Sequence, residues 1–119
     1  MNEAGGGPRD VRIALVTAPD ATVAERIVRA LVGEGLAVCG NIVQGVTSIY
    51  RWRGEVHRDA EVLIILKTTG TAADRLTRRV ADIHPYEVPE VLILPVESGH
   101  PPYLAWVVAG CATAGSETP

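Results

Sequence analysis

The stretch VHRDAEVLIILKT, from Val56 to Thr68, decides the fold of this 119-residue chain. Its second half is apolar on both faces of an extended strand, because side chains alternate along a strand. The two sets are Val62, Ile64 and Leu66 on one face and Leu63 and Ile65 on the other. Thirteen extended residues span roughly 40 Å, whereas a globule of about 110 residues is about 34 Å across. We therefore expect a strand buried on both sides, in a hairpin that overhangs its own domain.

The flanking segments alternate between strand and helix patterns. Short apolar runs predict strands, and apolar residues repeating every three to four positions predict helices. The predicted strands are Val11–Val16, Leu36–Trp52 with a bend at Gln44–Gly45, Val56–Thr68 and Val91–Val96. The predicted helices run from Asp20 or Thr22 to Gly33, from Thr71 to Ile83, and from Pro101 as a short C-terminal helix. If Thr22 is the cap of the first helix, Glu25 completes a capping box.

The element order βαββαβ predicts the fold class. With right-handed crossovers it gives an α+β, ferredoxin-like sandwich, in which two helices cover one face of a four-stranded antiparallel sheet. The hairpin between the second and third strands is long. We expect one domain over residues 11–112, with disordered tails at 1–10 and 113–119, because both ends have too few apolar residues to become ordered.

Composition and charge exclude several classes of protein. The net charge is -3 and the eleven Lys and Arg are scattered, so we expect no nucleic-acid partner. Apolar runs are too short to span a membrane, and we expect a cytoplasmic protein with reduced thiols at Cys39 and Cys111. No Ser-His-Asp or Cys-His set can be assembled, so we expect no enzyme.

Two strands carry apolar residues on both faces, although the helices cover only one face of the sheet. The third strand does so, and in the fourth Leu92 and Leu94 oppose Val91 and Ile93. A large apolar face is rarely left exposed on a monomer, so another subunit is expected to cover it. Aromatic residues are enriched at interfaces, which places Tyr50 and Trp52 there.

The connector from His84 to Glu90, HPYEVPE, holds an imidazole, a phenol and two carboxylates between a helix and a strand. Two interpretations stay open: a rigid connector in which His84 caps the helix C-terminus, or a metal site of His84 with Glu87 or Glu90. Cys39 is a further candidate ligand, although a cysteine on a strand is more often a small core residue. Because one chain offers no close ligand spacing, we expect ligands from several subunits to meet.

Two charged residues, Glu61 and Lys67, fall on the apolar face of Leu63 and Ile65. Charges there are costly unless they are paired. They predict either an ion pair with a neighbouring subunit or contact with an anion or other ligand in a cleft.

Several motifs resemble the CutA family of divalent-cation tolerance proteins. They are Thr17–Asp20, Cys39–Ile42, Ser48–Trp52, Leu66–Thr68, His84–Glu90 and Tyr103–Trp106. The resemblance covers nearly the whole folded unit and implies a ferredoxin-like fold, a tight homotrimer, and a role linked to copper and other divalent cations without an established enzymatic activity. Val16 stands where some members carry a cysteine tied to copper, and Gly40 stands where a larger apolar residue is usual, which is expected to loosen the strand.

Together these observations predict a homotrimeric divalent-cation tolerance protein that binds copper, another divalent metal or a small ligand at clefts between subunits. The alternatives are a PII-like trimeric signalling protein that senses a small anionic ligand, and a purely structural trimer. The residues assigned to the ligand cleft or the interface are Asn41, Tyr50, Trp52, Glu61, Lys67, Tyr86 and Trp106.

Overall fold

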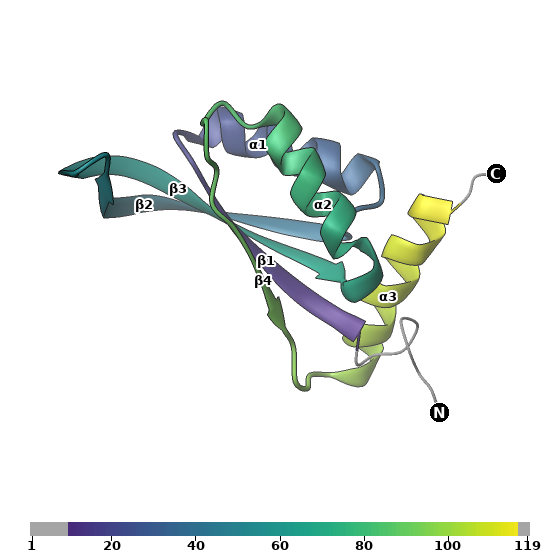
Figure 1. Cartoon of the computed structure of the whole chain (residues 1–119). Helices are drawn as coiled ribbons and strands as arrows, with labels where there is room; N and C mark the ends of the chain where they lie inside the picture. The colour runs from purple at the N-terminus through teal and green to yellow at the C-terminus, as the bar shows by residue number, and fades with distance from the viewer. Residues whose placement is uncertain (1–9, 117–119) are drawn as a thin grey trace.

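The computed structural model describes residues 10–116, with side chains to Cys111. The elements are β1 (Val11–Ala18), α1 (Ala21–Gly33), β2 (Cys39–Trp52), β3 (Glu55–Thr69), α2 (Gly70–Ile83), β4 (Val91–Pro95) and α3 (Pro101–Ser116). The strands form one antiparallel sheet in the order β2-β3-β1-β4. The predicted α+β, ferredoxin-like arrangement is confirmed. Helices α1 and α2 lie together on one face of the sheet (Figure 1).

Local sequence explains where the first two helices begin. Asp20 is the N-cap of α1, and its Oδ1 accepts a hydrogen bond from the backbone N–H of Val23 at 2.8 Å. The alternative cap at Thr22, with Glu25 as its capping-box partner, is therefore not used. Thr69 caps α2 in the same way, accepting from the backbone N–H of Ala72 at 3.3 Å. These two caps satisfy N–H groups that a helix leaves without intrahelical partners.

The main core lies between the helices and the sheet. Its strand residues come from alternate positions: of the two apolar sets of β3, the one with Val62, Ile64 and Leu66 faces the helices. The fully buried members with larger side chains are Val16, Ile27, Leu31, Ile64, Leu66, Leu76 and Val80. Val16 is thus enclosed by apolar side chains.

Gly40 lies where β2 passes under α1. A Cβ atom placed there would approach Cγ1 of Val28 to 2.7 Å and Cδ2 of Leu66 to 2.9 Å. The space of a larger residue is already filled by these two side chains. The neighbouring side chains close the gap at Gly40, and this close packing does not support the expected loosening of the strand.

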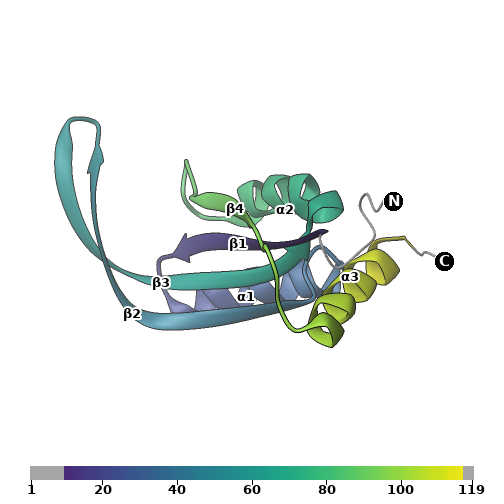
Figure 2. The same ribbon diagram turned by 90° about the horizontal axis from the view of Figure 1, so that it is seen from below.

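The β2–β3 hairpin projects beyond the rest of the domain, as the length of the Val56–Thr68 run predicts. The molecule measures 49 × 30 × 23 Å, and the hairpin forms its long axis (Figures 1 and 2). The pairing of β2 with β3 shifts between Val43 and Val46, and Gly45 has a φ of 83°, so the predicted bend is a β-bulge. Arg53 and Gly54, both with positive φ, make the two-residue turn.

The second face of the sheet is only partly covered. Helix α3 packs on Val11 through Leu104 and Val107, at one end of that face. Along the rest of the face Leu92 and Leu94 stay 54% and 42% exposed. Their register places them beside Leu15 and Ile13 of β1, which pair in turn with Ile65 and Lys67. The alternation predicted for β3 and β4 therefore leaves a broad apolar surface, the open face.

The C-terminal helix is longer than predicted. It has 16 residues and continues to Ser116, so it includes positions 113–116, which were expected in a disordered tail. Proline at its first position fits the helix N-terminus, and burial of Leu104, Val107 and Cys111 secures the helix against the sheet. Of the expected N-terminal tail, residues 1–9 lie outside the described residues, as do 117–119 at the other end.

In the described part of the chain, no helix is both long enough and apolar enough to cross a membrane.

Candidate functional site

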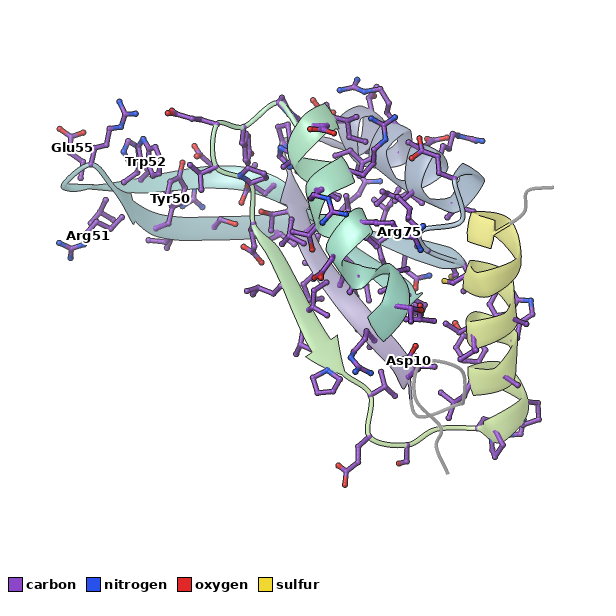
Figure 3. All side chains as sticks on the ribbon, turned by 45° about the vertical axis from the view of Figure 1, so that its right-hand side comes forward. Asp10, Tyr50, Arg51, Trp52, Glu55 and Arg75 are labelled. Atoms are coloured by element: carbon purple, nitrogen blue, oxygen red, sulfur yellow. The ribbon has the colours of Figure 1, made fainter. Side chains whose placement is uncertain are left out.

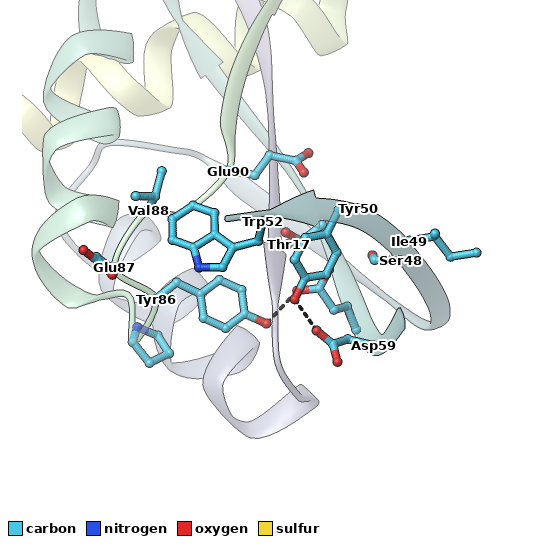
Figure 4. A pocket seen from close by; sticks show the side chains of 12 residues that line it. Thr17, Ser48, Ile49, Tyr50, Trp52, Asp59, Tyr86, Glu87, Val88 and Glu90 are labelled. Carbon is cyan, nitrogen blue, oxygen red and sulfur yellow. Dashed lines mark hydrogen bonds between the residues drawn. The ribbon is translucent and has the colours of Figure 1, made fainter. Parts of the chain in front are cut away.

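A groove of about 700 Å³ lies at the base of the overhanging hairpin. One wall is the hairpin, and the other is the connector between α2 and β4, with Thr17 of β1 beneath (Figure 4). The lining residues are Thr17, Ser48, Ile49, Tyr50, Trp52, Asp59, Glu61, Pro85, Tyr86, Glu87, Val88 and Glu90. The volume is that of a pocket for a small organic molecule. The groove therefore joins the predicted connector motif to the predicted aromatic residues of the hairpin.

Two phenols in the groove donate to two carboxylates of β3. The hydroxyl of Tyr86 donates to Oε2 of Glu61 at 2.6 Å, and the hydroxyl of Tyr50 donates to Oδ2 of Asp59. Burial and the bond to Glu61 raise the pKa of Tyr86, while the bond to Asp59 is the main cause that raises the pKa of Tyr50. Both phenols are therefore protonated donors at neutral pH rather than phenolate ligands.

His84 holds the connector in place. It is 7% exposed; its Nε2 lies 2.7 Å from the carbonyl oxygen of Thr17, and its Nδ1 accepts from the backbone N–H of Tyr86 at 3.1 Å. This pattern requires a proton on Nε2, which donates to Thr17. Neither nitrogen then has a free lone pair for a metal. These bonds favour the rigid connector, and His84 is the C-cap residue of α2, as that interpretation expects. Metal ligation by His84 stays a prediction.

Glu87 and Glu90 line the groove from the connector side, as part of the predicted site. Arg53 at the hairpin turn reaches the rim: its Nη2 lies 3.3 Å from Oε1 of Glu87, and its Cζ lies 5.2 Å from the ring centroid of Trp52. Both members of the ion pair are mostly exposed, so its net stabilisation is small. The rim thus already holds one cationic group over an aromatic ring.

The remaining predicted residues lie outside the groove. Cys39 and Asn41 at the start of β2 face Lys67, whose Nζ lies 3.8 Å from Sγ of Cys39 and donates to Oδ1 of Asn41. Trp106 lies on α3, half exposed, with its ring centroid 5.5 Å from that of Tyr103. Cys39 is therefore separated from the connector carboxylates, and Lys67 pairs within its own chain instead of reaching the groove.

Sequence reasoning missed Asp59, Ser48 and Thr17 as members of the groove. The strand register pairs Ser48 with Asp59 and Val46 with Glu61, which puts the two acidic residues on one face of the hairpin (Figure 3 shows the projecting strands). The signal available in the sequence was the pair of carboxylates at i and i+2 on one strand. Their contact with the connector was not visible, because Glu61 and Tyr86 are 25 positions apart and no local pattern brings them together.

Within the described residues, no three His, Cys, Asp or Glu side chains come close enough to hold one metal ion. The groove carboxylates share a cavity without converging on a point. A single chain therefore offers negative charge and hydrogen-bond acceptors, but no complete coordination sphere for one ion.

Comparisons with known proteins agree on one family. Residues 12–110 match the family model described as CutA1 divalent ion tolerance protein. The chain is 50% identical over 95 residues to the divalent-cation tolerance protein CutA of Thermus thermophilus, across 80% of this chain and 92% of that protein. It is 49% identical over 100 residues to protein CutA of Mus musculus, across 84% of this chain and 56% of that protein. The chain thus spans little more than half the length of this mammalian relative.

Solved structures give the same result. The divalent cation tolerance protein of Thermus thermophilus superposes with a TM-score of 0.80 at 49% identity, covering 82% of this chain and 94% of that one. CutA1 of Oryza sativa gives a TM-score of 0.83 at 37% identity, and the match covers 90% of this chain and 96% of that one. A structure from Archaeoglobus fulgidus is described as a periplasmic divalent cation tolerance protein. It gives a TM-score of 0.82 at 29% identity, and the match covers 85% of this chain and 98% of that one. None of these similarities supports the PII-like alternative.

Proposed function

Because the chain belongs to the CutA1 divalent ion tolerance family, we propose that it forms a homotrimer that binds a divalent cation, such as copper, at clefts between its subunits. The observation that carries this proposal is the position of the acidic groove, at the base of a hairpin that overhangs its own domain. An overhanging hairpin that meets a neighbouring subunit brings that subunit's side chains to the groove.

The open face supports assembly. Leu92 and Leu94 are exposed on the face of the sheet that α1 and α2 do not cover, and Ile49 and Val56 on the hairpin are 69% and 67% exposed. Apolar surfaces of this kind are rarely left in water. The sequence motifs of the family select three subunits over two.

The proposed cation site needs ligands from more than one subunit. Glu61, Glu87 and Glu90 present hard oxygen ligands, yet one chain does not gather three of them around a point. A second subunit that contributes to the cleft completes the set. The position of Val16 offers no thiol and is enclosed in the core, so the copper route through a cysteine there is absent.

The cytoplasmic location remains a prediction, since relatives are named as chloroplastic in Oryza sativa and periplasmic in Archaeoglobus fulgidus.

The assembly prediction is tested by light scattering of purified protein. We expect a mass of three times 12.6 kDa, because the open face and the hairpin both need cover. The measurement is made at micromolar concentration and repeated after dilution. A monomer throughout would contradict the proposed assembly and the intersubunit site together.

The metal prediction is tested by calorimetric titration of copper(II) and zinc(II) into wild type and Glu90→Gln. We expect binding to the trimer and weaker binding to the variant, because the amide loses the charge that holds a cation. Asp74→Asn, an exposed carboxylate on α2 outside the groove, is the matched control and should bind as wild type. Equal weakening in Asp74→Asn would indicate general charge attraction and would contradict a site at the connector.

A further inference from the structure

The groove is lined by acidic side chains, and the one cation found beside them among the described residues is Arg53 at the rim, paired with Glu87. The carboxylates of the groove are Asp59, Glu61, Glu87 and Glu90, and the lining contains no Lys, Arg or His. An anionic ligand would meet like charge in a partly desolvated space, which is unfavourable. A ligand that fits the groove must therefore be cationic or carry many hydrogen-bond donors.

Glu61 is the deepest of these carboxylates. It is 9% exposed, and Tyr86 donates to one of its oxygens. None of the ion pairs found among the described residues includes it. A buried carboxylate without a cationic partner is costly. A positive group bound in the groove would offset that cost.

The shape of the groove distinguishes a compact ion from an extended one. The carboxylates do not converge for a metal within one chain; they are distributed along a space of about 700 Å³. The rings of Tyr50, Trp52 and Tyr86 lie among them (Figure 4). Separate ammonium groups joined by methylene chains match this alternation, because charged ends reach carboxylates while the methylenes and cations pack on aromatic rings.

The rim already displays this mode of binding. The guanidinium of Arg53 lies over Trp52 and pairs with Glu87. The pair is exposed and weak, but its geometry shows that a cation fits between the indole and the carboxylate here. The inner part of the groove repeats the same elements with Tyr86 and Glu61, without a resident cation.

We propose that the groove binds an aliphatic polyamine, a flexible chain with two or more ammonium groups. The inference rests on the cation-binding role proposed for this groove and names a ligand class for it. The polyamine site differs from the proposed metal site in one requirement: its contacts lie within a single chain, whereas the metal site needs a second subunit.

The test is calorimetry at constant ionic strength with spermidine, putrescine and 1,4-butanediol, the neutral analogue of putrescine. We expect spermidine to bind more tightly than putrescine and butanediol not to bind. Glu61→Gln should bind spermidine about tenfold more weakly, since one charge-assisted hydrogen bond is lost. Trp52→Leu should also weaken binding through loss of the ring. Asp74→Asn, an exposed carboxylate on α2 outside the groove, is the matched control and should bind as wild type.

The proposal would be overturned by no binding of spermidine to wild type, by equal affinity in Glu61→Gln, or by equal weakening in Asp74→Asn, which would indicate general charge attraction. Magnesium is the compact dication for comparison with putrescine: tighter, Glu61-dependent binding of magnesium to the monomer would contradict the polyamine site. A variant made monomeric by Leu92→Glu and Leu94→Glu on the open face separates the two functions, because it should keep spermidine binding while losing metal binding. Loss of both in the monomer would contradict the single-chain polyamine site.

Discussion

A variant carrying both Leu92→Glu and Leu94→Glu is expected to be a folded monomer. Both side chains lie on the open face, opposite the core, so the substitutions leave the packing of α1 and α2 intact. Two carboxylates on each of three subunits would be buried without partners on assembly, and each such burial costs several kcal/mol. The measurements are light scattering for mass and circular dichroism for secondary structure. We expect one subunit mass, 12.6 kDa, with an unchanged spectrum.

Val32→Glu is the control for that experiment. Val32 is also an exposed apolar residue, 37% exposed, but it lies near the end of α1 on the helix-covered side. It should remain a trimer. If the Leu92 and Leu94 variant kept the trimer mass, the open face would not be the interface. If both variants dissociated, the helical layer would share in assembly.

Ile64→Ala is expected to lower the free energy of unfolding by about 2 to 5 kcal/mol. Ile64 is fully buried at the centre of β3, where the sheet meets both helices. Truncation to Ala removes buried apolar surface and leaves a cavity. The neighbouring side chains cannot close this cavity fully, because β3 is fixed by its paired strands. The measurement is urea denaturation in the monomeric background, where dissociation does not contribute to the transition.

Ile49→Ala is the matched control, because it makes the same change on the adjacent strand at 69% exposure. In the monomer it should change the free energy of unfolding by less than about 0.5 kcal/mol. If both variants lost the same free energy of unfolding, the difference in burial between Ile64 and Ile49 would be contradicted. In the trimer, a larger loss for Ile49→Ala would indicate that a neighbouring subunit covers it.

The groove was predicted in part. The connector motif placed Tyr86, Glu87 and Glu90 together, and the aromatic residues of the hairpin were assigned to a cleft or an interface. The role of His84 was not decided in the sequence, because an imidazole beside carboxylates fits a ligand and a packed connector equally well. Only the backbone groups of Thr17 and Tyr86, brought to its two nitrogens by folding, distinguish them.

The sequence by itself determined the order of elements, the doubly apolar third strand, the bend at Gln44–Gly45 and the overhang of the hairpin. Each depends on local periodicity, turn chemistry or chain length, and these act between residues close in sequence. The tertiary structure alone decided that Asp59 lies in the groove, that Glu61 bonds there to Tyr86 of the connector, and that Cys39 and Lys67 lie elsewhere. Those contacts join residues 25 or more positions apart, and their geometry depends on strand register and one β-bulge, which no local pattern specifies.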